Sequence, residues 1–137
     1  MTLTDACLAE VHEFHEFVEA WLAGRATRDD ETYERAHAVL ADDFEIVSPS
    51  GERRSRATLL DELEAAHGLH ADSSPPFEVD VREVRHRYTA GELCLVGYEE
   101  WQRVDGDETG RVSSALFRRD ETAPNGVEWL HLHETWR

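Results

Sequence analysis

The chain contains no lysine, only two cysteines and no long apolar segment. Cys7 and Cys94 are too few for a disulfide framework or a zinc knuckle, and we expect both to be buried, unreactive thiols. The longest apolar run, residues 93–98, is far shorter than the roughly 20 residues that a membrane span requires. The first residues carry neither a basic nor an apolar segment, so no secretory signal is expected. These features predict a soluble, cytoplasmic protein.

Acidic side chains dominate the charge. Thirty Asp and Glu residues stand against fourteen bases, all of them Arg, and the formal net charge is −16. Such a surface repels phosphate backbones, so we expect no nucleic-acid partner, and no membrane partner. The 137 residues fit one domain, 1–137, which is long enough to bury a core without a metal or disulfide.

A helical period dominates the first half of the chain. Apolar residues recur every three or four positions over 4–23 and again over 31–41, and a third helix is expected over 56–67. Ser55 suits the N-cap of that third helix, and Gly24 suits the position that follows the first. A short strand is expected over 44–48, between the second and third helices.

From Phe77 onward the apolar period changes to two. We expect a strand that bulges near Arg82–Glu83, followed by strands over 93–104, 109–119 and 127–136. Asp105-Gly106-Asp107 predicts a hairpin turn. Helices followed by antiparallel strands predict an α+β fold, a cone-shaped curved antiparallel sheet with about three N-terminal helices packed on its concave face. Such a cone is open at one end and holds a pocket.

Three segments support a family resemblance. They are Leu40-Ala-Asp-Asp-Phe44, Gly51 followed by Arg56-Ala-Thr-Leu-Leu60, and the terminal Trp129-Leu-His-Leu-His133-Glu-Thr-Trp136. With the order of elements, they resemble the nuclear transport factor 2-like superfamily, which contains ketosteroid-isomerase-like and polyketide-cyclase-like domains. The superfamily includes isomerases, cyclases, dehydratases, association modules and binding proteins, so the resemblance implies a fold and not a reaction. It also implies a homodimer that pairs through the outer face of the sheet.

His131 and His133 are two residues apart on the last expected strand, so they face the same side, together with Trp129 and Thr135. The resemblance implies that this strand lines the cavity. The histidines would then form a polar floor for a ligand, or one would act as a general base. The alternative is a pair of hydrogen-bonded histidines that only order the sheet.

The central hairpin carries a second polar group. With a two- or four-residue turn, Tyr98, Glu100 and Gln102 face the same side as Arg111, Ser113 and Ala115. Glu100 and Arg111 would then be able to form an ion pair across the strands. A three-residue turn would instead bring Glu99 and Trp101 to the side of Arg111. The polar face would line a wet pocket, or it would face solvent or a dimer partner.

The first helix offers two further candidates. His15 falls on its apolar stripe and Trp21 lies near its end, where it would line a pocket mouth. Glu10 falls mainly outside that stripe. His15, His131 and His133 would be able to hold a metal ion only if they converged, and we expect neither a metal nor a cofactor.

We therefore expect a small-molecule-binding protein with its pocket between the first helix and the curved sheet. The candidate pocket residues are His15, Trp21, Tyr98, Glu100, Arg111, Ser113, His131 and His133. One alternative is an isomerase, cyclase or dehydratase that uses a His or Glu base, with Tyr98 as proton donor. The other is a homo-oligomerisation module without a ligand.

Overall fold

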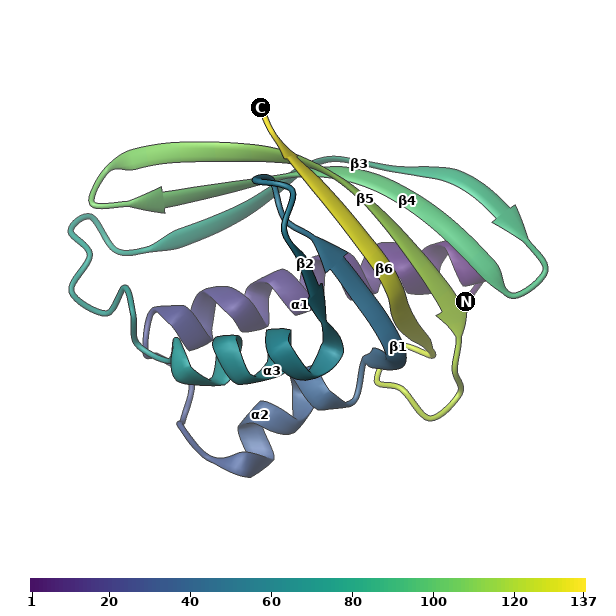
Figure 1. Cartoon of the computed structure of the whole chain (residues 1–137), viewed down its shortest axis with the longest axis horizontal. Coiled ribbons are helices and arrows are strands. Elements are labelled where there is room, and N and C mark those ends of the chain that lie inside the picture. Colours follow the sequence, from purple (N-terminus) through teal and green to yellow (C-terminus); the bar gives the residue numbers. More distant parts are fainter.

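A computed structural model describes all 137 residues as three helices on one side of a six-stranded sheet (Figure 1). The elements are α1 (Leu3–Leu22), α2 (Asp30–His37), β1 (Leu40–Val47), β2 (Arg53–Ser55), α3 (Arg56–Ala65), β3 (Glu78–Ala90), β4 (Leu93–Val104), β5 (Asp107–Arg119) and β6 (Val127–Trp136). The strand order is β2-β1-β6-β5-β4-β3. The expected α+β fold, with the helices on the concave face of a curved open sheet, is confirmed.

The four long strands β3 to β6 pair antiparallel in chain order, and β1 adds to β6 in parallel. The second helix is shorter than expected, because Leu40 and Ala41 belong to β1 and not to α2. Both residues are buried, and a short buried run has no period that separates a helix end from a strand start. The three-residue strand β2, which pairs with β1, was not expected from the sequence.

Local sequence signals fix the helix starts. Thr2 and Asp5 form a capping box at the start of α1, and the Ser55 side chain accepts a hydrogen bond from the backbone N–H of Thr58 at the start of α3. One expectation for α1 is wrong. Glu10 is fully buried, because α1 packs on the sheet along a wider face than the apolar stripe indicates.

The expected hairpin turn and strand bulge are both present. Val104 pairs with Asp107, so the turn contains two residues, Asp105 and Gly106, with φ of 51° and 85°. Two consecutive positive φ values are typical of a type I′ turn, which matches the twist of the strands. In β3 the register shifts between Arg82 and Arg85, and again between His86 and Tyr88. Such bulges bend a strand, and they curve this edge of the sheet.

The core lies between α1 and the inner face of the sheet. Cys7 and Cys94 are both fully buried and form no disulfide. Burial raises the pKa of the Cys7 thiol well above its ordinary value. None of the three helices combines the length and the apolar character that crossing a bilayer would need.

Candidate functional site: a cavity between α1, α3 and the sheet

A cavity of about 150 Å³ lies on the concave side of the sheet. Its apolar wall consists of Phe14, Val18, Leu40, Phe44, Ile46, Leu59, Leu63, Trp129 and Leu132. Its polar lining consists of His15, Glu100, Arg111 and Glu134. An apolar cavity with a few polar groups that converge in it is the usual form of a small-molecule site.

The sheet register places the polar side chains in two rows across three strands. Tyr98 of β4 lies opposite Ser113 of β5, which lies opposite Glu134 of β6. The next row begins with Glu100 opposite Arg111. Because inward-facing residues alternate along a strand, both rows project to the concave side. The two-residue turn therefore selects the expected arrangement of Tyr98, Glu100, Arg111 and Ser113.

α1 adds His15 to this group. One ring nitrogen, Nδ1, lies 2.6 Å from the Val11 carbonyl oxygen, and the other, Nε2, lies 3.1 Å from Oε1 of Glu100. Both partners are acceptors, so both nitrogens must donate, which requires the protonated ring. Burial lowers the pKa of His15, but the charge and hydrogen bond of Glu100 outweigh it, so that the pKa is raised overall.

The pKa of Glu100 moves in the opposite direction. Burial raises it, but the charge and hydrogen bond of His15, the charge of Arg111 and a hydrogen bond from Gln102 lower it to about 2. The Gln102 amide donates to Oε2 of Glu100 over 2.6 Å. Glu100 is therefore a carboxylate at neutral pH, held by groups on α1 and on its own strand.

The ion pair that this register would allow between Glu100 and Arg111 does not form. Arg111 instead donates to Oε1 of Glu134 over 3.1 Å, and its guanidinium lies 5.0 Å from the ring centre of Trp136. Burial and the nearby charge of Glu100 raise the pKa of Glu134, although Arg111 opposes them. The site therefore holds two carboxylates in different environments, and Glu134 is the one that takes up a proton more readily.

Two enclosed hydroxyl groups adjoin this cluster. The side-chain oxygens of Tyr98 and Ser113 are buried and have no hydrogen-bond partner. Burial and the two carboxylates raise the pKa of Tyr98 well above its usual value, so its hydroxyl keeps its proton. Buried polar groups are seldom unpaired, but neither Tyr98 nor Ser113 lines the cavity itself, so these two expected pocket residues lie beside the cluster and behind its surface.

The structure does not bring His131 and His133 to the cavity. Trp129 pairs with Phe117 and His131 pairs with Leu116, so Leu130 is an extra residue in β6. This irregularity reverses the alternation, so Trp129 and Leu132 line the cavity while the histidines face the other side. The expectation that Trp129 shares a face with them is wrong. His15 is thus separated from His131 and His133 by the sheet, and the three cannot bind one metal ion.

Trp21 also lies away from the cavity. It is buried, and its indole N–H donates to the Leu63 carbonyl oxygen over 2.7 Å. It therefore joins α1 to α3 behind the cavity wall instead of lining a mouth.

Sequence reasoning missed Glu134 as a site residue. Glu134 lies two positions after Leu132 on β6, so the two side chains face the same side of the sheet. That spacing is the feature of the sequence that points to Glu134. It also missed the support behind Trp129. The indole N–H of Trp129 donates to Glu10, whose carboxylate also accepts from Arg35 and Asn125 over 2.8 to 3.2 Å. Glu10 therefore fixes the aromatic wall.

Comparisons with known proteins agree with this fold. Residues 8–137 match the model of the family described as sucrose-6-phosphate phosphohydrolase C-terminal. The chain is 24% identical to sucrose-phosphatase 2 of Nicotiana tabacum over 93% of its own length. It spans only 30% of the length of that relative.

Solved structures share the fold at low sequence identity. An NTF-2 like protein of unknown function from Pseudomonas aeruginosa has a TM-score of 0.84 at 22% identity, over 96% of this chain and 98% of that chain. A CaMKII hub from S. rosetta has a TM-score of 0.65 at 15% identity, with coverages of 97% and 95%. A putative ketosteroid isomerase from Parabacteroides distasonis has a TM-score of 0.55 at 12% identity, with coverages of 83% and 80%.

The expected resemblance is therefore confirmed at the level of the fold, and the neighbours include proteins of different function. The chain has a nuclear transport factor 2-like fold and belongs to the sucrose-6-phosphate phosphohydrolase C-terminal family.

Proposed function

We propose that this domain binds a small molecule in the cavity between α1, α3 and the sheet. One observation carries the proposal. An apolar cavity ends on four ionisable side chains, His15, Glu100, Arg111 and Glu134, which the sheet register and α1 hold together. A merely structural core would not require four such groups at one point, because burying charge is costly.

The cavity indicates the class of ligand. About 150 Å³ is below the roughly 300–1,000 Å³ of sites for drug-sized ligands, so the ligand is small. Arg111 makes one side-chain hydrogen bond, to Glu134, and its remaining N–H groups suit a carbonyl or carboxylate oxygen. The unpaired hydroxyls of Tyr98 and Ser113 lie in the adjoining row. The ligand is therefore a short apolar molecule with a ketone or carboxylic acid at one end.

The proposal is tested by thermal unfolding in the presence of small organic probes. The probes are carboxylic acids, methyl ketones and alkanes of about four to eight carbons, which is roughly the size that the cavity can hold. The acids or ketones should raise Tm by mass action, and the alkanes should do so less. Leu59→Phe, which fills the cavity wall, should abolish the shift. Leu69→Phe is the matched control, because Leu69 is 66% exposed. No shift with any probe, or an undiminished shift in Leu59→Phe, would refute the proposal.

A second candidate is proton transfer next to a carbonyl, as in an isomerase or dehydratase. Glu134 favours it, because a carboxyl with a raised pKa in an apolar cavity suits a general base or acid near neutral pH. Tyr98, whose buried hydroxyl lies in the neighbouring row and has no hydrogen-bond partner, is the candidate donor to the developing oxyanion. Exchange of α-protons of a bound methyl ketone in D₂O, measured by NMR, distinguishes this candidate from binding alone. Glu134→Gln should abolish exchange while binding persists.

A homodimer remains a prediction. Some proteins with this fold carry the name of an association hub, and light scattering of the purified domain measures its mass directly. A monomer at all concentrations would contradict it.

A further inference from the structure

The polar end of the concave cavity holds two positive and two negative side chains. Nε2 of His15 lies 3.1 Å from Glu100, and Arg111 donates to Glu134 over 3.1 Å. The rest of the lining is apolar, and the side chains that α3 and β1 contribute carry no charge. When all four groups are ionised, their charges cancel, so no unbalanced charge is left to pair with a charged ligand.

The pair of His15 and Glu100 is satisfied within the protein. Both ring nitrogens of His15 donate, one to the Val11 carbonyl oxygen and one to Oε1 of Glu100. The second oxygen of Glu100 accepts from the Gln102 amide over 2.6 Å. This pair therefore sets the charge balance of the site, and the groups that would bind a ligand belong to the other pair.

The pair of Arg111 and Glu134 uses only part of its hydrogen-bonding capacity. Arg111 donates to Oε1 of Glu134, and Oε2 of Glu134 accepts no hydrogen bond. A guanidinium has several N–H donors, and a carboxylate oxygen can only accept. Glu134 is 5% exposed, and both residues line the cavity. Unused donors and one unused acceptor therefore adjoin each other at the end of an apolar cavity.

A carboxylate ligand would disturb the charge balance around Glu134. The titratable groups that face Glu134 are Arg111 of β5, Glu100 and Tyr98 of β4 and His15 of α1. A ligand anion would add a third negative charge to this set. Burying an unpaired charge is costly, and two carboxyl groups that share a site hold one proton between them. Burial and the charge of Glu100 already raise the pKa of Glu134, which favours the uptake of that proton.

We propose that the cavity selects a neutral head group with one acceptor and one donor, a primary amide or an undissociated carboxylic acid, and that Glu134 determines this selectivity. The selectivity rests on the proposed function, since it concerns a ligand of the same cavity. The carbonyl oxygen of the head group accepts from Arg111, and its N–H or O–H donates to Oε2 of Glu134. A carboxylic acid therefore binds together with about one proton from solvent, whereas an amide binds without proton uptake.

Isothermal titration with three probes of similar shape tests the selectivity. The probes are pentanamide, pentanoic acid and butyl methyl ketone. Between about pH 6 and 8, the Kd of pentanoic acid should rise about tenfold per pH unit, because its undissociated fraction falls by that factor above an ordinary carboxyl pKa. The Kd of pentanamide should stay constant, which also controls for the titration of His15. The ketone has no donor and leaves Oε2 of Glu134 unpaired, so it should bind more weakly than the amide.

Glu134→Gln is the variant that tests the role of this residue. It removes one negative charge from the cluster, so that a carboxylate ligand would restore the balance. In this variant the Kd of pentanoic acid should no longer change between about pH 6 and 8. Glu121→Gln is the matched control, because Glu121 is exposed and makes no ion pair. It should keep the pH dependence of the wild type.

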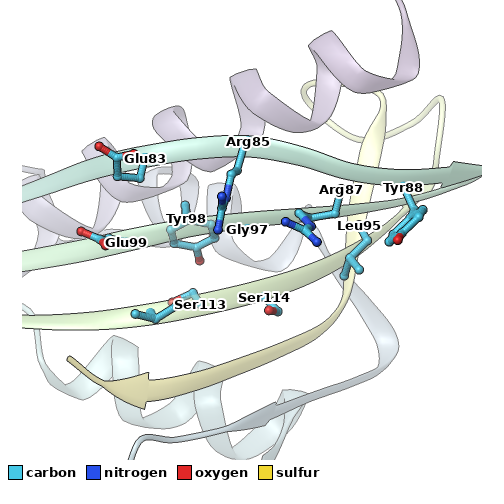
Figure 2. A pocket seen from close by; sticks show the side chains of 11 residues that line it. Glu83, Arg85, Arg87, Tyr88, Leu95, Gly97, Tyr98, Glu99, Ser113 and Ser114 are labelled. Atoms are coloured by element: carbon cyan, nitrogen blue, oxygen red, sulfur yellow. The ribbon is translucent and has the colours of Figure 1, made fainter.

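The same variant separates the cavity from the larger groove on the other face of the sheet. That groove has a volume of about 320 Å³ and lies over β3, β4 and β5, and none of the four side chains of the cluster lines it (Figure 2). A probe bound there would keep its affinity in Glu134→Gln. An unchanged Kd of pentanoic acid at about pH 8 in this variant would therefore overturn the selectivity.

A second measurement uses the wild type alone. Binding heats in two buffers of different ionisation enthalpy give the proton uptake, which should be about one proton for pentanoic acid near pH 7 and about zero for pentanamide. The selectivity is overturned if pentanoic acid binds without proton uptake and with a Kd that does not depend on pH, or if the ketone binds as tightly as the amide. In those cases the proposed function stands, because a small molecule still binds. If none of the probes binds, the proposed function fails together with the selectivity.

Discussion

Replacing Glu100 by Gln removes the negative charge that faces His15 and tests the electrostatics of the cavity. The pKa of Glu100 falls from its ordinary 4.5 to about 2 in the folded chain. Each pKa unit corresponds to about 1.4 kcal/mol, so ionised Glu100 contributes about 3 kcal/mol to the free energy of unfolding. We expect Glu100→Gln to lose about this amount in the pH range where both His15 and Glu100 are charged.

The pH dependence has a definite sign on each side. Because the folded-state pKa of Glu100 is lowered, its contribution is complete above pH 4.5 and is lost as the pH falls toward 2. Because the folded-state pKa of His15 is raised, its contribution is complete below pH 6.5 and is lost as the pH rises through that raised pKa. The difference in stability between wild type and Glu100→Gln should therefore be greatest between pH 4.5 and 6.5.

This difference is measured by urea unfolding, followed by tryptophan fluorescence. The measurements are made at about pH 3, 5.5 and 8.5, which lie below, between and above the ordinary pKa values of Glu and His. Glu16→Gln is the matched control on α1, because Glu16 is exposed and makes no side-chain hydrogen bond or ion pair. It should change stability by no more than about 0.5 kcal/mol. The reasoning is refuted if wild type and Glu100→Gln differ in the free energy of unfolding by the same amount at all three pH values. It is also refuted if that difference is greatest at pH 8.5.

Two further predictions concern the supports of the site. Glu10→Gln weakens the buried ion pair with Arg35 and should lower the free energy of unfolding, measured in urea, by about 3 kcal/mol. A loss below about 1 kcal/mol would show that the domain does not depend on that ion pair. Gly110→Ala would place a Cβ 2.7 Å from the Trp101 ring, so the indole must move. This should lower the free energy of unfolding by about 1–3 kcal/mol and shift the Trp101 emission to longer wavelength. An unchanged emission spectrum, with Trp101→Phe as the reference for that signal, would contradict the second prediction.

The polar rows on β4 and β5 were predictable only as one of two arrangements, because the length of the turn was open. The observed two-residue turn, Asp105-Gly106, determines which residues face each other for the length of the hairpin. It selects the grouping of Tyr98, Glu100, Arg111 and Ser113 over the alternative with Glu99 and Trp101. The partners of these residues do not follow from the turn, since His15 reaches Glu100 from a helix 85 positions earlier in the chain.

The last strand was harder to predict because an irregularity changes its phase. With regular alternation, Trp129, His131 and His133 would share a face, and the aromatic residue would bring the histidines inward. The extra residue at Leu130 reverses this relation, and no Gly or Pro in the segment marks it. Burial of Glu10 was equally hidden, because its three partners Arg35, Asn125 and Trp129 come from separate parts of the chain.

The two parts of the cavity differ in how firmly they are held. The polar end stands on the central strands β4, β5 and β6, where the paired backbone fixes each side chain. The opposite wall includes Leu59 and Leu63 of α3, a ten-residue helix with a single buried residue, Leu60. Elements with few buried apolar contacts open at lower free energy than core strands. A ligand would therefore meet a fixed polar end and an adaptable apolar wall, so the cluster decides the chemical group that binds and α3 decides the size of the rest.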